Sequence, residues 1–154
     1  VINVTTSKEM FDAVRKELQK KYDIVIMAAA TSDYTPQNPS KSKIKSDKKS
    51  LVIRLKKTPK IIDIVKKYQK NTLLVGFKAE TNLSKNALIK SAKIKIKETG
   101  ADMIIANDIG KKYQKNTNYN QIIVVDNKKS IITGWKKKEK IVQIIKNEIE
   151  KKLE

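Results

Sequence analysis

The 154-residue chain contains no cysteine and no histidine. Without cysteine there can be no disulfide framework, no thiolate metal site and no cysteine nucleophile. Without histidine the chain lacks the commonest general base and metal ligand, and it cannot hold a Ser-His-Asp triad. Any catalysis would therefore use Lys, Asp, Glu, Asn and backbone groups, which suit the positioning and neutralisation of charge better than proton relay.

Glycine and long apolar runs are also scarce. The four glycines lie far apart, so neither G-x-G-x-x-G nor G-x-x-x-x-G-K-[ST] occurs, which argues against a generic dinucleotide-binding domain. No Asp or Glu cluster has metal-ligand spacing, so we expect no protein metal site. No run of 18 apolar residues and no signal peptide is visible, and we expect a cytoplasmic protein without a membrane partner. The chain begins with Val1 rather than Met, so we expect it to be a piece of a longer polypeptide.

Lysine, in contrast, is abundant, and the formal net charge is +19. Such a charge suggests nucleic acid, but only Arg15 and Arg54 among the 35 basic residues are arginine, whose fork reads base edges best. The lysines are also spread along the chain in pairs and triples. We therefore interpret most of them as solvated surface and do not expect nucleic acid as a partner. The alternative, a lysine-rich nucleic-acid-binding α/β module, predicts binding that weakens steeply with salt.

Short apolar runs predict the strands. A short strand is expected at 1–4, and three continuous runs of strand length are expected to be buried on both faces of a sheet, at Asp23–Ala29, Leu73–Phe77 and Asp102–Ala106. Alternation from Leu51 to Leu55 predicts a half-buried strand. Two further apolar runs flank residues 126–129, which predicts a hairpin.

Helical periodicity predicts four helices between or after these strands. Thr6 and Glu9 form a capping box, Thr58-Pro59 predicts a second start, and Gly100 predicts the end of a helix that begins near Ser84. The last helix is expected at about 136–153. The alternation predicts one α/β domain, with a three-layer, Rossmann-like, mainly parallel sheet, helices on both faces and a small antiparallel addition.

Ligands in such folds bind beyond the carboxyl ends of the parallel strands, where polar residues stand in this chain. Small residues at 28–30 let a flat ring approach, and Asp33 can bind a ribose hydroxyl or cap a turn. Phe77 can stack on a base or belong to the core. Asn107-Asp108 can bond a ligand or the loop backbone.

Two positively polarised features can take phosphates. Thr58-Pro59 at a helix start would leave free N–H groups, which either bind an anion or merely begin a helix. Lys93 and Lys97 lie four apart on one predicted helical face and can neutralise a triphosphate, or can be plain surface lysines. Lys43 can reach phosphates or be exposed.

Six motifs in this order resemble the phosphopantothenate–cysteine ligase (phosphopantothenoylcysteine synthetase) family, commonly the C-terminal half of a bifunctional coenzyme A biosynthesis protein. The similarity covers nearly the whole chain. The motifs stand at Ala29–Tyr34, Lys43–Lys45, Thr58–Ile62, Gly76–Thr81, Lys93–Lys97 and Ala106–Asp108.

The resemblance implies a reaction in which a nucleotide, CTP more than ATP, activates the carboxylate of 4′-phosphopantothenate with Mg²⁺. An acyl-nucleotidylate forms, pyrophosphate leaves, and the amine of cysteine attacks to give 4′-phosphopantothenoylcysteine. The resemblance also implies a homodimer, built partly on the 44–56 region. It further implies a fused or associated phosphopantothenoylcysteine decarboxylase.

The resemblance assigns roles to residues. Lys43 would be catalytic in turnover of the acyl intermediate and would also contact the nucleotide, and Asn107 and Asp108 are substrate-side candidates. The remaining nucleotide contacts would be Met27, Ala28, Ala29, Asp33, Pro59, Lys60, Ile61, Ile62, Phe77, Lys93 and Lys97.

The chain departs from the family pattern in several places. Lys60 stands where Asp is common, Lys78 replaces a small residue, and the spacing to Asp102 lets the Lys93/Lys97 alignment slip to Lys95. Nothing in the chain matches the family's first strand or its phosphopantothenate-binding loop. We therefore expect residues 1–154 to be a ligase domain lacking those parts, which binds nucleotide but is incomplete or inactive as a ligase on its own.

Overall fold

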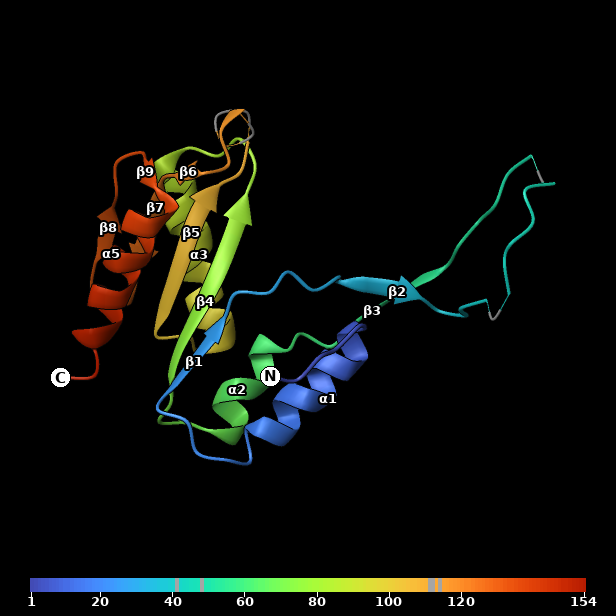
Figure 1. The fold of residues 1–154 in the computed structure, drawn as a ribbon, viewed down its shortest axis with the longest axis horizontal. Coiled ribbons are helices and arrows are strands. Elements are labelled where there is room, and N and C mark those ends of the chain that lie inside the picture. Colours follow the sequence, from blue (N-terminus) through green and yellow to red (C-terminus); the bar gives the residue numbers. More distant parts are fainter. Residues whose placement is uncertain (41, 48, 111–112, 114) are drawn as a thin grey trace.

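The computed structural model describes residues 1–40, 42–47, 49–110, 113 and 115–154. Its centre is a five-stranded sheet in the order β1-β4-β5-β7-β8 (Figure 1). Strands β1 (Ile24–Met27), β4 (Leu73–Glu80) and β5 (Met103–Asp108) are parallel, and β7 (Ile122–Val125) and β8 (Ser130–Ile132) add an antiparallel hairpin. The predicted mainly parallel α/β sheet is confirmed.

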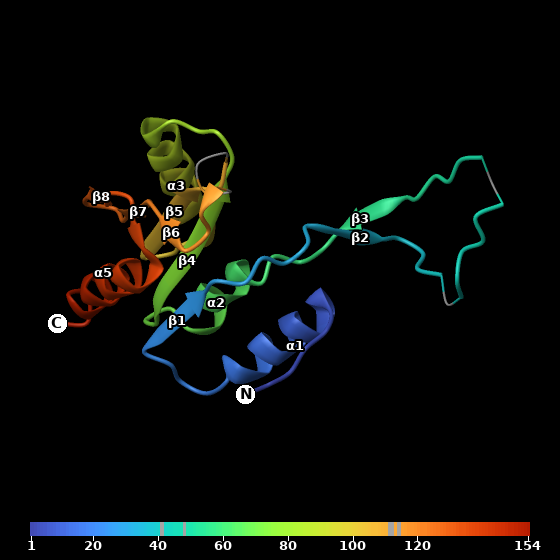
Figure 2. The same ribbon diagram turned by 45° about the horizontal axis from the view of Figure 1, so that its top comes forward.

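Helices cover both faces of this sheet, as predicted (Figure 2). On one face lie α1 (Ser7–Glu17), α2 (Ile62–Tyr68) and α3 (Lys85–Thr99), and α5 (Lys138–Glu150) lies on the other. Alternate residues of β5 serve the two layers, because Ile104 packs with α1–α3 and Ile105 packs with α5, and both are fully buried. Among the described residues, no helix is long and apolar enough to cross a membrane.

Local signals explain most helix ends. The Thr6 hydroxyl accepts from the Glu9 N–H while the Glu9 carboxylate accepts from the Thr6 N–H, so the predicted capping box is present. The Ser84 hydroxyl caps α3, and Gly100 ends it at φ 68°, a left-handed conformation that glycine adopts without strain. The predicted start at Thr58-Pro59 is wrong, because α2 begins at Ile62.

A long arm leaves the body between β1 and α2. It starts as a two-stranded ladder, β2 (Tyr34–Pro36) with β3 (Leu55–Lys57), and residues 37–40, 42–47 and 49–54 extend beyond it (Figure 1). The predicted half-buried strand at 51–55 is wrong, since Leu51, Ile53 and Leu55 are all more than half exposed and Val52 is 87% exposed. The alternation is real, but these side chains border only a groove shared with residues from the other side of the arm, such as Pro36 and Ile44.

Two further predictions fail at the first strand. Residues 1–4 form no strand, and β1 is the edge of the sheet. Ile26 is 51% exposed, and Ile24, Val25 and Met27 are only half-buried, so the Asp23–Ala29 run is not buried on both faces. In contrast, residues 103–106 of β5 are fully buried as predicted, because β5 has β4 and β7 as neighbours.

The carboxyl-terminal part is closed by short ladders and a buried ion-pair cluster. β6 (Tyr119–Asn120) pairs with β9 (Lys136–Lys137) just before α5. The predicted turn at 126–129 is present. Asp126 accepts from the N–H groups of Lys128 and Lys129, both at 2.7 Å, and pairs with Lys152 at 2.8 Å beyond the end of α5. This cluster attaches the helix end to the hairpin.

Candidate functional site

The carboxyl ends of the parallel strands are staggered, because β4 and β5 end together whereas β1 ends opposite the middle of β4. Met27 is opposite Gly76 in the β1–β4 register. Asn107 and Asp108 are opposite Ala79 and Glu80 in the β4–β5 register. Asn107 and Asp108 therefore stand at the shared end of β4 and β5, whereas Met27 to Ala29 lie where the shorter β1 ends (Figure 1).

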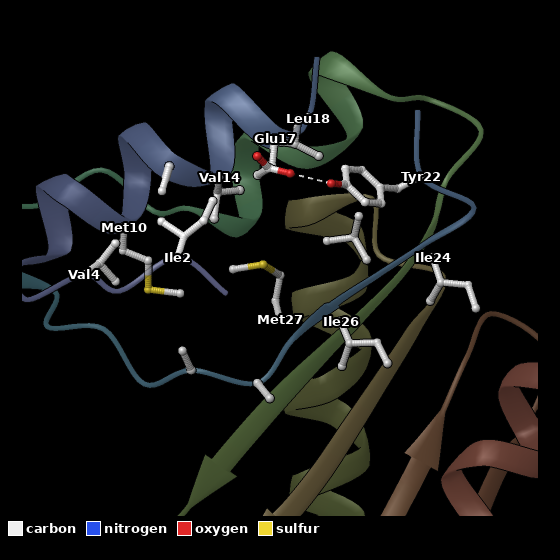
Figure 3. Close-up of a pocket in the computed structure, with 14 residues that line it drawn as sticks. Ile2, Val4, Met10, Val14, Glu17, Leu18, Tyr22, Ile24, Ile26 and Met27 are labelled. Carbon is white, nitrogen blue, oxygen red and sulfur yellow. Dashed lines mark hydrogen bonds between the residues drawn. The ribbon is translucent and has the colours of Figure 1, made fainter. Parts of the chain in front are cut away.

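A cavity of about 500 Å³ lies beside Met27, Ala28 and Ala29, between the first residues of the chain, α1 and β1. Figure 3 shows Met10 and Met27 pointing into it. Its walls are mainly aliphatic and thioether groups, so it suits an apolar or flat group better than a phosphate. The residues that line it are Ile2, Val4, Met10, Ala13, Val14, Glu17, Leu18, Tyr22, Ile24, Val25, Ile26, Met27, Ala28 and Ala29.

The polar rim of this cavity is one hydrogen-bonded pair. The Tyr22 hydroxyl donates to the Glu17 carboxylate at 2.5 Å (Figure 3). Hydrogen bonds from Lys20 and then Tyr22 lower the pKa of Glu17, and the same carboxylate raises the pKa of Tyr22. Both groups therefore keep their ordinary charge state at neutral pH, and neither is poised as an acid or base there.

Gly76 has a packing role that its position in the predicted motif did not reveal. A Cβ at this position would lie 2.7 Å from Ile104 Cδ1 and 2.8 Å from Ile62 Cδ1. The glycine thus lets the start of α2 approach the sheet closely. Phe77, the next residue, is 39% exposed on the opposite face of the sheet from Met27. The two predicted base contacts are neighbours in register but do not share a face.

A small polar recess lies at the root of the arm. It has a volume of about 170 Å³ and is lined by Asp33, Tyr34, Lys57, Thr58 and Lys60. The Thr58 N–H donates to the Asp33 carbonyl at 2.9 Å, and the Thr58 hydroxyl donates to the Ser32 carbonyl at 2.5 Å. Thr58 therefore joins the two sides of the recess and does not cap a helix. The structure brings together two predicted residues here, Asp33 and Lys60.

The helix start itself offers less than predicted. Pro59 and Lys60 are exposed and precede α2, Ile61 is buried in the core, and Ile62 packs against Gly76. Since α2 has only seven residues and begins at Ile62, the free N–H groups of a helix start at Thr58-Pro59 are not formed there.

Apart from Lys60, the predicted lysines lie away from these cavities. Lys43 is exposed in the arm, within the segment 37–54 that extends away from the body (Figure 1). Lys93 and Lys97 share a shallow groove on α3, and every residue that lines this groove belongs to α3. Their proposed roles in catalysis and phosphate binding remain predictions, because the structure does not join them to Asp33 or Met27.

Beyond β4 and β5, the polar side chains bond to the protein itself. Asp108 Oδ1 accepts from the N–H groups of Asn82 and Gly110, both at 2.8 Å. The Lys78 ammonium, 2.9 Å from Glu80, lowers the pKa of that carboxyl more than burial raises it. The unusual Lys78 is thus the ionic partner of Glu80. Asn107 is half-buried beside them.

Lys57 and the apolar cavity were missed by the sequence reasoning. Lys57 lies opposite Tyr34 only because of the β2–β3 register, which no local signal specifies. The cavity depends on how α1 and residues 2–4 sit against β1. In the described ranges, no group of three or more Asp and Glu residues could hold a metal ion.

Comparison with known proteins decides the family. The profile of the DNA/pantothenate metabolism flavoprotein C-terminal domain matches residues 1–153. The chain belongs to this family. Among relatives of this domain, the coenzyme A biosynthesis bifunctional protein CoaBC of Thermococcus kodakarensis is 49% identical over 109 residues, 70% of this chain. That of Methanocaldococcus jannaschii is 36% identical over 145 residues, 93% of this chain.

This C-terminal domain also has a solved relative. The DNA/pantothenate metabolism flavoprotein from Streptococcus pneumoniae superimposes with a TM-score of 0.81 at 27% identity, over 96% of this chain and 70% of that chain. The chain spans 27% and 35% of the length of the two curated relatives. The match therefore concerns one domain of proteins that are considerably longer.

Proposed function

We propose that the chain is a phosphopantothenate–cysteine ligase domain acting in coenzyme A biosynthesis. The observation that carries this proposal is the match of residues 1–153 to the pantothenate-metabolism C-terminal domain, with relatives that are named coenzyme A biosynthesis proteins. The six motifs that led to the same family from the sequence support it independently, because they cover the same length of chain.

The reaction needs charge neutralisation more than proton transfer. A carboxylate oxygen of 4′-phosphopantothenate attacks the α-phosphorus of CTP, and pyrophosphate leaves. The cysteine amine then attacks the acyl carbon, CMP leaves with the bonding electrons of the acyl–oxygen bond, and the amine gives up a proton. Lysines and oriented backbone donors can stabilise each developing negative charge without histidine. CTP is proposed in preference to ATP.

The geometry supports a division of labour around residues 27–34. The apolar cavity beside Ala28 and Ala29 suits the uncharged part of a ligand, and the polar recess suits hydroxyls and phosphate oxygens. The Asp33 carboxylate can accept a hydrogen bond from a ribose hydroxyl. Lys43 is on the arm and would reach the acyl group only if the arm lies over a nucleotide site. We include that placement of the arm in the proposal.

Mg²⁺ is proposed as the metal that accompanies the nucleotide. The nearby carboxylates fit a protein-built cage poorly, since Glu80 is held by Lys78 and Ser91 and Asp108 Oδ1 by two backbone N–H groups. Mg²⁺ commonly keeps several waters and binds through substrate phosphates. It would therefore be held mainly by the nucleotide and would neutralise the leaving pyrophosphate.

A thermal-shift experiment tests the class of function. The chain is heated with CTP, ATP, NAD or duplex DNA, each with Mg²⁺. A ligand that binds only the folded state at 100 times its Kd stabilises it by about 2.7 kcal/mol. We expect stabilisation by CTP, less by ATP and none by NAD. Stabilisation by DNA alone, with a steep salt dependence, would show a nucleic-acid-binding module instead.

A turnover assay tests the reaction itself. CTP, 4′-phosphopantothenate and cysteine are added to the chain, and pyrophosphate release is measured. Since nothing in these 154 residues matches the family's phosphopantothenate-binding loop, we expect nucleotide binding with little or no turnover. Robust product formation would contradict this expectation.

We also propose a homodimer that uses the arm, with a fused or associated decarboxylase as a further partner. The arm carries exposed apolar side chains at Ile44 and Leu51–Ile53. Val52→Asp should shift the mass measured by light scattering from dimer to monomer, whereas Ser50→Asp adds the same charge without removing an apolar group and should not. A monomeric mass for the wild-type chain would refute this assembly.

A further inference from the structure

The recess at the root of the arm has the size of a subsite for one small group. Its volume is about 170 Å³, and a liquid water molecule takes roughly 30 Å³, so it has room for roughly five waters. A phosphoryl group with one or two waters fits this space, but a whole nucleotide does not. Any larger ligand would place only one of its polar ends here.

The walls of the recess are fixed before a ligand binds. The two hydrogen bonds from Thr58 to the Ser32 and Asp33 carbonyls join its two sides. The pairing of Tyr34 with Lys57 in the β2–β3 ladder sets the backbone position of Lys57. A subsite that is already ordered loses little conformational entropy on binding.

The charge balance of the recess favours an anion. Two lysines, Lys57 and Lys60, and one aspartate, Asp33, are among the five residues that line it. In the part of the chain that the structure describes, none of these three groups has an ion-pair partner within 4.0 Å. By comparison, Lys66 and Lys152 lie 2.7 and 2.8 Å from carboxylates. The recess thus combines a net charge of +1 with two lysines that form no close ion pair among the described residues.

We propose that this recess is a phosphoryl-binding subsite in which Lys57 and Lys60 bind the phosphate oxygens. The assignment of its ligand rests on the proposed function, which offers two phosphoryl sources: the polyphosphate of the nucleotide and the 4′-phosphate of phosphopantothenate. Asp33, on the other side of the recess, would face hydroxyl groups of the same ligand. Lys57 then becomes a substrate-binding residue that the sequence motifs did not single out.

Lys56 provides a matched control for Lys57. Successive residues of a strand point to opposite faces, and Lys56 pairs with Thr35 and does not line the recess. Both lysines are exposed. Lys57→Gln and Lys56→Gln therefore remove the same charge from adjacent positions, and only the first removes it from the recess.

The test is isothermal titration calorimetry of inorganic pyrophosphate into the wild-type chain and the Lys56→Gln, Lys57→Gln and Lys60→Gln variants, at constant ionic strength. We expect Lys57→Gln and Lys60→Gln each to weaken binding about tenfold, the effect of one charge-assisted hydrogen bond. Lys56→Gln should change the affinity by less than about twofold. Circular dichroism checks that each variant is folded.

Equal effects of Lys56→Gln and Lys57→Gln would overturn the proposal, as would failure of the wild-type chain to bind pyrophosphate. Competition of CTP or 4′-phosphopantothenate with pyrophosphate identifies the source of the phosphoryl group. If CTP stabilises the chain but Lys56→Gln and Lys57→Gln have equal effects on pyrophosphate binding, the proposed function stands and the subsite is refuted. If pyrophosphate binding depends on Lys57 but neither substrate competes, the subsite stands and the proposed substrates are wrong.

Discussion

Gly76→Ala is expected to destabilise the fold, and the size of the effect follows from two distances. The added Cβ would lie 2.7 Å from Ile104 Cδ1 and 2.8 Å from Ile62 Cδ1, against roughly 3.5–4.0 Å for relaxed carbon contacts. Ile104 is fully buried and cannot retreat far. Overpacking of this kind destabilises by about 1–3 kcal/mol, and the intrinsic preference for Ala over Gly in a strand returns roughly 0.5–1 kcal/mol. We expect a net loss of about 1 kcal/mol.

A double-mutant cycle isolates the cause. Ile62→Val and Ile104→Val each remove one of the two Cδ1 atoms that the new methyl group would meet, and each alone should destabilise the fold by about 0.5–1.5 kcal/mol. In the Gly76→Ala background, each Ile→Val substitution should lower the free energy of unfolding by less than it does in the wild type, or not at all, with a coupling energy of about 1 kcal/mol. Urea unfolding followed by circular dichroism measures this, with an unchanged m-value. Additive effects, or a Gly76→Ala variant as stable as wild type, would refute the packing argument.

Three further outcomes are expected. Burial raises the pKa of Asp126, but hydrogen bonds from Lys152 and two backbone N–H groups lower it by more, so the pKa in the folded state is below its usual value. The ionised carboxylate therefore stabilises the fold above the unfolded-state pKa, and this stabilisation is lost as the pH falls through the folded-state pKa. Asp126→Asn should therefore be less stable than wild type in urea at pH 7, and the difference should shrink toward pH 3; a constant difference contradicts this. The Gln69 side chain bonds the carbonyls of residues 18 and 20 and the N–H of residue 22, so Gln69→Ala should lose about 1–3 kcal/mol in thermal unfolding, and Gln19→Ala almost nothing. If Lys93 binds nucleotide phosphates, Lys93→Gln should weaken CTP binding several-fold in calorimetry, and an unchanged affinity would remove it from the site.

Features that depend on neighbours in sequence were predictable. The Thr6–Glu9 capping box, the Gly100 helix end and the turn at Asp126 each use hydrogen bonds between residues no more than four apart. The burial of β5 was also predictable, because a continuous apolar run of strand length is typical of a strand that is covered on both faces of a sheet. These signals were enough for the architecture.

Features that depend on distant partners were not predictable. Thr58-Pro59 has the residues of a helix start, but the Thr58 hydroxyl bonds the Ser32 carbonyl across the arm root, and α2 begins later. Lys57 faces the recess and Lys56 does not, because of a ladder register between segments far apart in sequence. The residue types of the candidate site could thus be identified from motifs, but their grouping could not.

The errors at 23–29 and 51–55 have a common physical cause, which bears on the proposed assembly. An apolar pattern indicates that a surface is to be covered, but it does not indicate which element covers it. Ile26 and Val52 are both more than half exposed, yet Ile26 borders a cavity within the body while Val52 stands on an arm that projects from it (Figure 1). Exposed apolar groups that cluster on a projecting arm are typical of an interaction surface. The arm, rather than the body, is therefore where the light-scattering test of the dimer should find its effect.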